Sequence, residues 1–322
     1  MRNIKIKFVD FWGDFNHQDN FIINTLRKRY NPILSDDPEY LFYSTFGFSH
    51  LRYDCVKIMF VGENIVPDFN VCDYALGFDW LTFGDRYMRF PLYLVSDCFK
   101  RFSKEKHFDE EKVLKRKFCS IVVSNAKIAN PIREQFFRKL SEYKQVDSGG
   151  RLWNNVGGPV ADKFDFVSQY KFNIAFENSS VYGYTTEKIM DPMTVNTVPI
   201  YWGNPLIGKE FNTASFVNVN DYASIDEAIE RIIELDNNDA LYLKMLREPW
   251  VQDESLLVWE DNLLAFLSNI IEKPLEQAKY VTDFGSQKLH KRDLLIADFF
   301  GRRMNLNKMI SAYQSWINTK SK

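Results

Sequence analysis

The stretch Lys171–Pro205, KFNIAFENSSVYGYTTEKIMDPMTVNTVPIYWGNP, decides the fold of this chain of 322 residues. Its pattern predicts a buried strand at Phe172–Phe176, a polar elbow, a short helix that opens near Thr185, and a second strand at Val198–Trp202. Strand, helix and strand in this order are typical of a βαβ unit in a parallel sheet. In open sheets of this kind, ligands bind where the carboxyl ends of the strands meet the following loops.

The loop between this strand and this helix is dense in polar groups. It carries one carboxylate, one amide, two phenols and one ammonium within a few residues of the strand end. Polar groups gather at the end of an apolar strand where an open α/β sheet binds a ligand. The stretch therefore predicts both a parallel sheet and a binding site at its edge.

The composition is that of an ordinary soluble globular protein, with 26% charged and 45% hydrophobic residues. The length favours two domains over one, and each would be large enough to bury a core. The net charge of −2 argues against nucleic acid as the main partner. Aromatic residues reach 16%, which core packing mostly explains, although aromatic faces also stack on sugars.

Several classes of enzyme are disfavoured by what the motifs lack. The four cysteines have no CxxC spacing, so we expect reduced core residues and no disulfide or zinc framework. The four histidines form no HExxH pattern, which argues against a metallohydrolase. The glycine-rich loop Ser148–Pro159 lacks the ending of a P-loop, and no GxGxxG fingerprint of a dinucleotide-dependent oxidoreductase follows a strand.

The chain is expected to divide into three parts. The βα pattern becomes regular after a charged run at Asp109–Lys117, so residues 1–116 and 117–272 are predicted to form two α/β domains. Residues 273–322 form a basic tail in which apolar side chains are interspersed. Two interpretations of the tail stay open, a helix packed on the fold and a helix that lies on a membrane surface.

Arg133 occupies a position where a cation is not expected. Asn130 suits the N-cap of the helix that follows, and Pro131 suits its first position. Arg133 then lies in the first turn, where the helix dipole already favours negative charge. Lys188 repeats this pattern in the first turn of the next predicted helix. An anion bound at these positions would relieve the mismatch, and solvent-facing cations are the alternative.

Several motifs in order resemble those of the α1,3/α1,4-fucosyltransferases, which form glycosyltransferase family 10. That family carries FxFENS, YxTEK and VPIYWG phrases, and this chain has FNIAFENS, YGYTTEK and VPIYWGNP, followed by FVNVNDY at Phe216–Tyr222. The resemblance extends in scattered motifs from about residue 4 to 270 and is densest between residues 118 and 222. The FENS tetrapeptide alone would be weak evidence for this family, whereas several motifs in the same order make a specific match.

The resemblance implies a GT-B type fold, with two Rossmann-like α/β domains facing a cleft. The first domain would hold the acceptor, and the second would hold GDP-fucose. The implied reaction is an inverting transfer of L-fucose to the N-acetylglucosamine of N-acetyllactosamine-type acceptors, through α1,3 or α1,4 linkages, as in the synthesis of Lewis antigens on bacterial surface polysaccharide. Transfer of another nucleotide sugar, and a non-catalytic carbohydrate-binding protein, are the alternatives.

The resemblance also assigns roles to residues. Glu63 follows the predicted strand Lys57–Val61 and matches the glutamate of the family's GEN motif, so we expect it to be the general base. Lys188 matches a lysine that contacts the diphosphate, and Glu187 matches a glutamate that holds the ribose hydroxyls. Arg133 matches an arginine that the family carries in the helix after a strand end of the type Ser124–Asn125–Ala126, and it is expected to bind the donor together with Asn178 and Tyr184.

Two further predictions are less specific. Arg151 would add charge to the donor site if the glycine-rich loop closes over it, and a plain surface connector is the alternative. Trp12 and Asp14 belong to a phrase similar to the WWGD of bacterial relatives, with Phe11 in place of one tryptophan, and are expected to line the acceptor site.

The expected partners are GDP-fucose and Galβ-GlcNAc oligosaccharides. No acidic DxD triad lies in a plausible loop, so no metal is expected at the donor site, and stimulation by a divalent cation stays open. An alternating strand at Ile4–Phe8 opens the chain, and no run of residues reaches transmembrane length. We therefore expect a cytoplasmic bacterial enzyme, with peripheral contact to the inner membrane through the tail as an open alternative.

Overall fold

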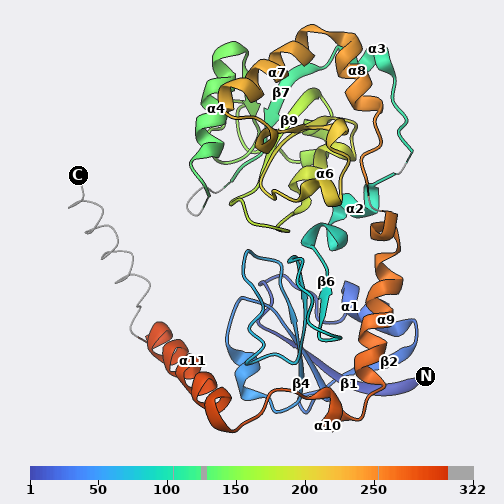
Figure 1. Cartoon of the computed structure of the whole chain (residues 1–322), viewed down its shortest axis with the longest axis vertical. Helices are drawn as coiled ribbons and strands as arrows, with labels where there is room; N and C mark the ends of the chain where they lie inside the picture. Colours follow the sequence, from blue (N-terminus) through green and yellow to red (C-terminus); the bar gives the residue numbers. More distant parts are fainter. Residues whose placement is uncertain (104, 125–128, 253, 304–322) are drawn as a thin grey trace, which may run out of the picture. The chain divides into compact units, whose positions relative to one another are not determined.

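The computed structural model describes residues 1–103, 105–124, 129–252 and 254–303 (Figure 1). These residues fold into two compact units, each built on its own sheet. The described residues of the first unit are Met1–Gly77, Thr82–Met88 and 260–303. The second unit contains Phe78–Leu81 and Arg89–Trp259.

The sheet of the first unit has six strands in the order β2-β1-β3-β4-β5-β6, and the strands from β2 to β5 pair in parallel. In β1, Ile4, Ile6 and Phe8 are buried and alternate with more exposed residues, which confirms the predicted opening strand. Because β1 pairs with β2 on one side and β3 on the other, the strand order reverses between β1 and β3. The strands are β1 (Arg2–Val9), β2 (Tyr30–Leu34), β3 (Tyr40–Tyr43), β4 (Val56–Phe60), β5 (Tyr74–Gly77) and β6 (Tyr87–Arg89).

The chain returns to the first unit after residue 259. Nη1 of Arg2 donates to the backbone oxygen of Ile271 at 2.9 Å, and the hydroxyl of Tyr40 donates to the same oxygen at 3.3 Å. Residues up to 272 were expected in the second domain, but the buried leucines and isoleucines of this returning helix hold it in the first unit. The helices of this unit are α1 (Phe21–Arg27), α9 (Trp259–Ile271), α10 (Leu275–Ala278) and α11 (Gly285–Arg303).

The sheet of the second unit has five strands in the order β11-β10-β9-β7-β8, all paired in parallel. Both strands predicted from the deciding stretch are present, as β9 and β10. Every residue of β9 is buried, as expected for a central strand covered on both faces. The strand order reverses between β7 and β9. The strands are β7 (Lys117–Ile121), β8 (Val146–Ser148), β9 (Tyr170–Phe176), β10 (Val198–Trp202) and β11 (Val217–Asn218).

The helix expected after Asn130 begins where the sequence predicts. The side chain of Asn130 accepts a hydrogen bond from the backbone N–H of Ile132 at 3.0 Å at the start of α4, and the side chain of Ser224 caps α7. Figure 1 shows α4, α7 and α8 around the strands β7 and β9. The helices are α2 (Asp97–Arg101), α3 (Glu110–Leu114), α4 (Ile132–Tyr143), α5 (Lys163–Val167), α6 (Glu187–Met193), α7 (Ile225–Asn237) and α8 (Asp239–Arg247).

Within residues 273–303, the described part of the basic tail, the short helix α10 is followed by the longer helix α11. The helix α11 is joined to the first unit near its start, where Nε2 of His290 lies 2.7 Å from a carboxylate oxygen of Asp68. Phe284 is 78% exposed, and Phe299 and Phe300 are each about half exposed, so these rings are not part of the core. The tail beyond residue 303 lies outside the described residues. Within the described ranges, no helix is both long enough and apolar enough to cross a membrane.

The glycine-rich loop after β8 lies against the end of β7. The backbone N–H of Gly149 donates to the oxygen of Ile121 at 2.9 Å, and that of Leu152 donates to the oxygen of Val123 at 2.9 Å. Between these contacts, a Cβ atom added to Gly150 would lie only 2.0 Å from the backbone oxygen of Val123. Because backbone atoms cannot move aside cheaply, glycine is required here for the loop to reach the strand end.

We predict that Gly150→Ala destabilises the protein by about 2 kcal/mol or more, because the new methyl group overlaps the backbone at Val123. Thermal unfolding would measure this as a lower melting temperature. Gly13→Ala is the control, because nothing lies within 4 Å of a Cβ added there. Equal melting temperatures for the two variants would contradict the prediction.

Candidate active site

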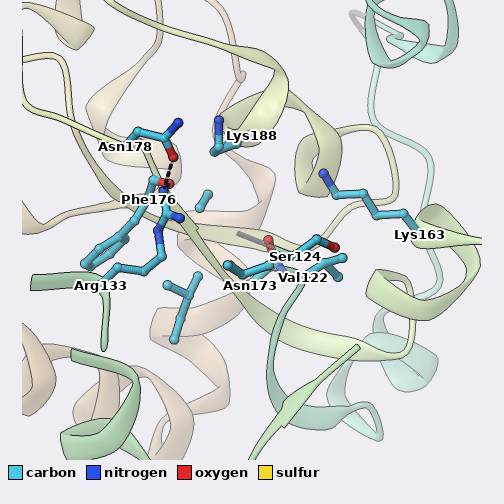
Figure 2. A pocket seen from close by; sticks show the side chains of 11 residues that line it. Val122, Ser124, Arg133, Lys163, Asn173, Phe176, Asn178 and Lys188 are labelled. Atoms are coloured by element: carbon cyan, nitrogen blue, oxygen red, sulfur yellow. Dashed lines mark hydrogen bonds between the residues drawn. The ribbon is translucent and has the colours of Figure 1, made fainter. Parts of the chain in front are cut away.

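A pocket of about 200 Å³ opens at the carboxyl ends of β7 and β9 in the second unit (Figure 2). This is where the strand order reverses, and open α/β sheets bind their ligands at such a point. The lining comes from the residues after β7, from β9 and its elbow, and from the starts of three helices. The lining residues are Val122, Val123, Ser124, Arg133, Lys163, Asn173, Ile174, Ala175, Phe176, Asn178 and Lys188.

The pocket is strongly cationic. Arg133, Lys163 and Lys188 line it, and no described residue with a carboxylate does. Each of these cations lies in the first turn of its helix, in α4, α5 and α6 respectively. Three positive charges around one small pocket favour a multiply charged anion as its ligand.

Arg133 is held in place by the end of β9. Its Nη2 donates to the backbone oxygen of Phe176 at 2.9 Å and to Oδ1 of Asn178 at 2.8 Å, as Figure 2 shows. The residue is 3% exposed, and within the described structure its buried Nε has no hydrogen-bond partner. Burial lowers the pKa of Arg133, whereas the negative charge of Glu177 raises it. The guanidinium is therefore oriented by two fixed oxygens and retains unused capacity to donate.

Lys188 is surrounded by oxygen atoms. Its Nζ lies 2.9 Å from the hydroxyl of Thr186, 3.2 Å from Oε2 of Glu177 and 3.8 Å from Oε1 of Glu187. Burial alone would lower the pKa of Lys188, but the charges of Glu177 and Glu187 outweigh burial and raise it above its usual value. The lysine thus stays charged, although only 27% of its side chain is exposed.

Lys163 was missed by the sequence predictions. It is the first residue of α5, and Asp162 caps this helix by accepting from the backbone N–H of Asp165. Its ammonium forms an ion pair with Asp191 of α6 and lines the same pocket. A cation in the first turn of a helix is unfavourable next to the helix dipole, and this signal identified Arg133. The same signal is present at Lys163.

Of the other residues predicted to bind the donor, some lie at the pocket and others do not. Asn178 lines the pocket, and Glu187 lies beside Lys188 with a third of its side chain exposed. Tyr184 is 3% exposed and packs its ring against Phe78 at 5.1 Å, outside the lining. Arg151 is exposed in the glycine-rich loop and is not a lining residue. Asn125 and Ala126 of the family phrase lie outside the described residues.

The predicted base and acceptor residues belong to the first unit. Glu63 is exposed just past β4, and Trp12 and Asp14 follow β1. The ring of Trp12 lies 6.4 Å from that of Phe60, the last residue of β4, and 6.5 Å from that of Phe46, which follows β3. Trp12 and Phe46 therefore mark the point where the strand order of this sheet reverses, one strand away from Glu63.

Sequence comparison matches both units to one family. Residues 6–96 match the profile described as the alpha-(1,3)-fucosyltransferase FucT N-terminal domain. Residues 113–280 match the profile described as glycosyltransferase family 10 (fucosyltransferase), C-terminal. An alpha-(1,3)-fucosyltransferase FucT of Helicobacter pylori is 37% identical over 84% of this chain and 66% of its own length.

Other relatives agree with this match. A putative fucosyltransferase of Acanthamoeba polyphaga mimivirus is 29% identical over 71% of this chain and 40% of its own length. The chain thus spans about two thirds of the length of the bacterial relative and less than half of the viral one. The crystal structure of an alpha1,3-fucosyltransferase with GDP-fucose superposes with a TM-score of 0.73, at 34% identity, over 85% of this chain and 92% of its own. This likeness identifies the fold as GT-B type.

Proposed function

The chain belongs to glycosyltransferase family 10, the fucosyltransferases, and we propose that it transfers L-fucose from GDP-fucose to a hydroxyl of an oligosaccharide. The observation that carries the proposal is the cationic pocket at the carboxyl ends of β7 and β9. A relative of the same fold has been crystallised with GDP-fucose. Diphosphate is a multiply charged anion of the kind that such a pocket suits.

In the proposed reaction, the carboxylate of Glu63 accepts the proton of the acceptor hydroxyl. The acceptor oxygen forms a bond to the anomeric carbon of fucose while the bond from that carbon to the β-phosphate oxygen breaks. The electron pair of the broken bond stays on the phosphate oxygen, so GDP leaves as an anion that needs no proton. Attack from the face opposite to the leaving group inverts the anomeric centre.

The departing GDP is stabilised by Arg133, Lys163 and Lys188. These groups gain most where negative charge grows on the diphosphate, so they lower the barrier and also bind the donor. Because side chains supply three positive charges, we propose that donor binding does not require a divalent cation.

The remaining donor residues keep their predicted roles as part of the proposal. Glu187 would accept hydrogen bonds from the ribose hydroxyls, and Asn178 would contribute from the elbow after β9. Tyr184 would support the donor site indirectly, because its ring is buried against Phe78 and the residue does not line the pocket. Arg151 would reach the donor only if its loop moves, since it does not line the pocket.

The acceptor in this proposal is the N-acetylglucosamine of an N-acetyllactosamine-type disaccharide or its β1,3 isomer, in an α1,3 or α1,4 linkage. Trp12 and Asp14 would contact it, together with Phe46, which is 52% exposed beside Trp12. Aromatic side chains offer flat apolar faces to sugar rings, and these two lie at the strand reversal of the first unit.

We predict that Arg133→Ala, Lys163→Ala and Lys188→Ala each weaken the binding of GDP by about tenfold to a hundredfold, because each removes a charge-assisted contact worth roughly 1.5–3 kcal/mol. Isothermal titration calorimetry with GDP measures the effect without turnover. Lys139→Ala is the control, because Lys139 is an exposed lysine on the same helix as Arg133 and pairs with Asp226. Unchanged affinity in all three pocket variants would remove the donor site from this pocket.

We predict that Glu63→Gln lowers turnover by about a hundredfold or more and leaves GDP affinity within about twofold, because the amide keeps the shape but cannot accept the proton. Release of GDP in the presence of acceptor measures turnover. Glu276→Gln, at another exposed glutamate of the first unit, is the control and should behave as wild type. Turnover of Glu63→Gln within a few-fold of wild type would exclude it as the base.

A further inference from the structure

The side chain of Glu177 is fully buried at the end of β9, next to the pocket but outside its lining. Its Oε1 accepts from the backbone N–H of Thr186 at 2.7 Å, and its two oxygens lie 3.0 and 2.8 Å from the hydroxyl of Thr186. Its Oε2 lies 3.2 Å from Nζ of Lys188. Every hydrogen bond that the described structure gives this carboxylate thus goes to Thr186 or Lys188.

The backbone of Glu177 is fixed to the sheet. Its N–H donates to the oxygen of Trp202, the last residue of β10, at 2.8 Å. The side chain then passes Gly203, where an added Cβ atom would lie 2.5 Å from Cγ of Glu177. Any larger residue at Gly203 would collide with this side chain. The carboxylate therefore starts from a rigid strand end and reaches its partners through a passage that a glycine keeps open.

We propose that Glu177 is a positioning residue, which holds the ammonium of Lys188 charged and in place for the diphosphate without touching the donor. The inference rests on the proposed function, because it requires an anion in the pocket. A buried ammonium without a counter-charge would lose its proton or turn away from the pocket. Glu177 prevents both, because it supplies the opposite charge from a fixed position.

Thr186 connects the two charges. Its hydroxyl contacts both oxygens of Glu177 and lies 2.9 Å from Nζ of Lys188. The hydroxyl thus bridges the two charged groups and restricts where the ammonium can lie. As the residue before α6, Thr186 makes no side-chain hydrogen bond that caps the helix. Its hydroxyl therefore serves the ion pair, and a residue of the same shape without it would keep the helix.

Other ionisable groups also face Lys188 or share its surroundings, and they must be considered in any measurement that varies pH. They come from α6 itself, from the turn before it and from the neighbouring helices α4 and α5. They are Glu187 and Asp191 on α6, Tyr184 in the turn, Arg133 on α4 and Lys163 on α5. Because so many groups titrate around this site, a comparison of variants at one pH is a cleaner test than a pH profile.

A double-mutant cycle separates this role from a general effect on folding. In the wild-type background, Glu177→Gln should weaken GDP binding about tenfold, because Lys188 loses the nearer of its two counter-charges and the one that holds it in place. In the Lys188→Ala background, the same change should strengthen GDP binding by about threefold or more. There the carboxylate has no ammonium partner and repels the diphosphate, so its removal relieves repulsion.

Calorimetry with GDP at pH 7.5 on the four proteins of the cycle, with melting temperatures beside it, gives the answer. Opposite signs in the two backgrounds support the proposal. A loss of equal size in both backgrounds, or no effect in either, would overturn it. If Lys188→Ala itself binds GDP as well as wild type, the proposed contact between Lys188 and the diphosphate fails, which is a different result from failure of the positioning role.

Two further variants serve as a control and as a substitute in this experiment. Asp147→Asn changes another buried carboxylate of this unit, which accepts from Tyr170, and it should leave GDP affinity within about twofold in both backgrounds. Thr186→Val serves if Glu177→Gln does not fold, because it keeps the shape and leaves both charges in place. It should weaken GDP binding about threefold in the wild-type background and have no effect beside Lys188→Ala. Equal losses in both backgrounds would again overturn the proposal.

Discussion

The concentration of positive charge at the end of one parallel sheet is the constraint on which the second unit depends. Arg133, Lys163 and Lys188 come from three different helices, yet parallel crossovers bring the starts of these helices to the same edge of the sheet. Cations that are brought together in this way repel one another and lose hydration. The fold compensates with oxygen atoms fixed by the backbone, such as that of Phe176 for Arg133, and with carboxylates placed behind the pocket wall.

Residues that line the pocket and residues that support them from behind have different roles in this arrangement. Cations line the pocket, and the carboxylates of Glu177 and Asp191 contact them without being among its lining residues. A supporting carboxylate keeps a buried lysine charged while the pocket is empty. The same carboxylate would repel a diphosphate if it lined the pocket, so its position behind the wall matters as much as its charge.

Much of this could be predicted from the sequence, because the relevant signals are local. The apolar runs of β9 and β10 gave their positions to within two residues, and Asn130 and Pro131 located the start of α4. The misplaced cations Arg133 and Lys188 indicated an anion site, and both line the pocket. The family motifs led to the fold and the family that the comparisons then showed.

What the sequence did not predict depends on contacts between distant residues. The helix α9 has an apolar face whose partner the sequence does not name, and its contacts with first-unit residues such as Arg2, Tyr40 and Tyr74 assign it to that unit. The glycines of the loop after β8 suggested mobility, but Gly150 is needed for close approach to Val123. Tyr184 lies in a phrase that resembles a family motif, yet its ring packs against Phe78, which is about a hundred residues earlier in the sequence.

The most direct test of the whole account is a product assay with the purified protein, GDP-fucose and N-acetyllactosamine, in which NMR assigns the new glycosidic bond. The account predicts a fucosylated trisaccharide with fucose α-linked to the N-acetylglucosamine, formed together with one equivalent of GDP. Other nucleotide sugars should give no product under the same conditions. Release of GDP without a trisaccharide, or a product formed only from a different nucleotide sugar, would contradict it.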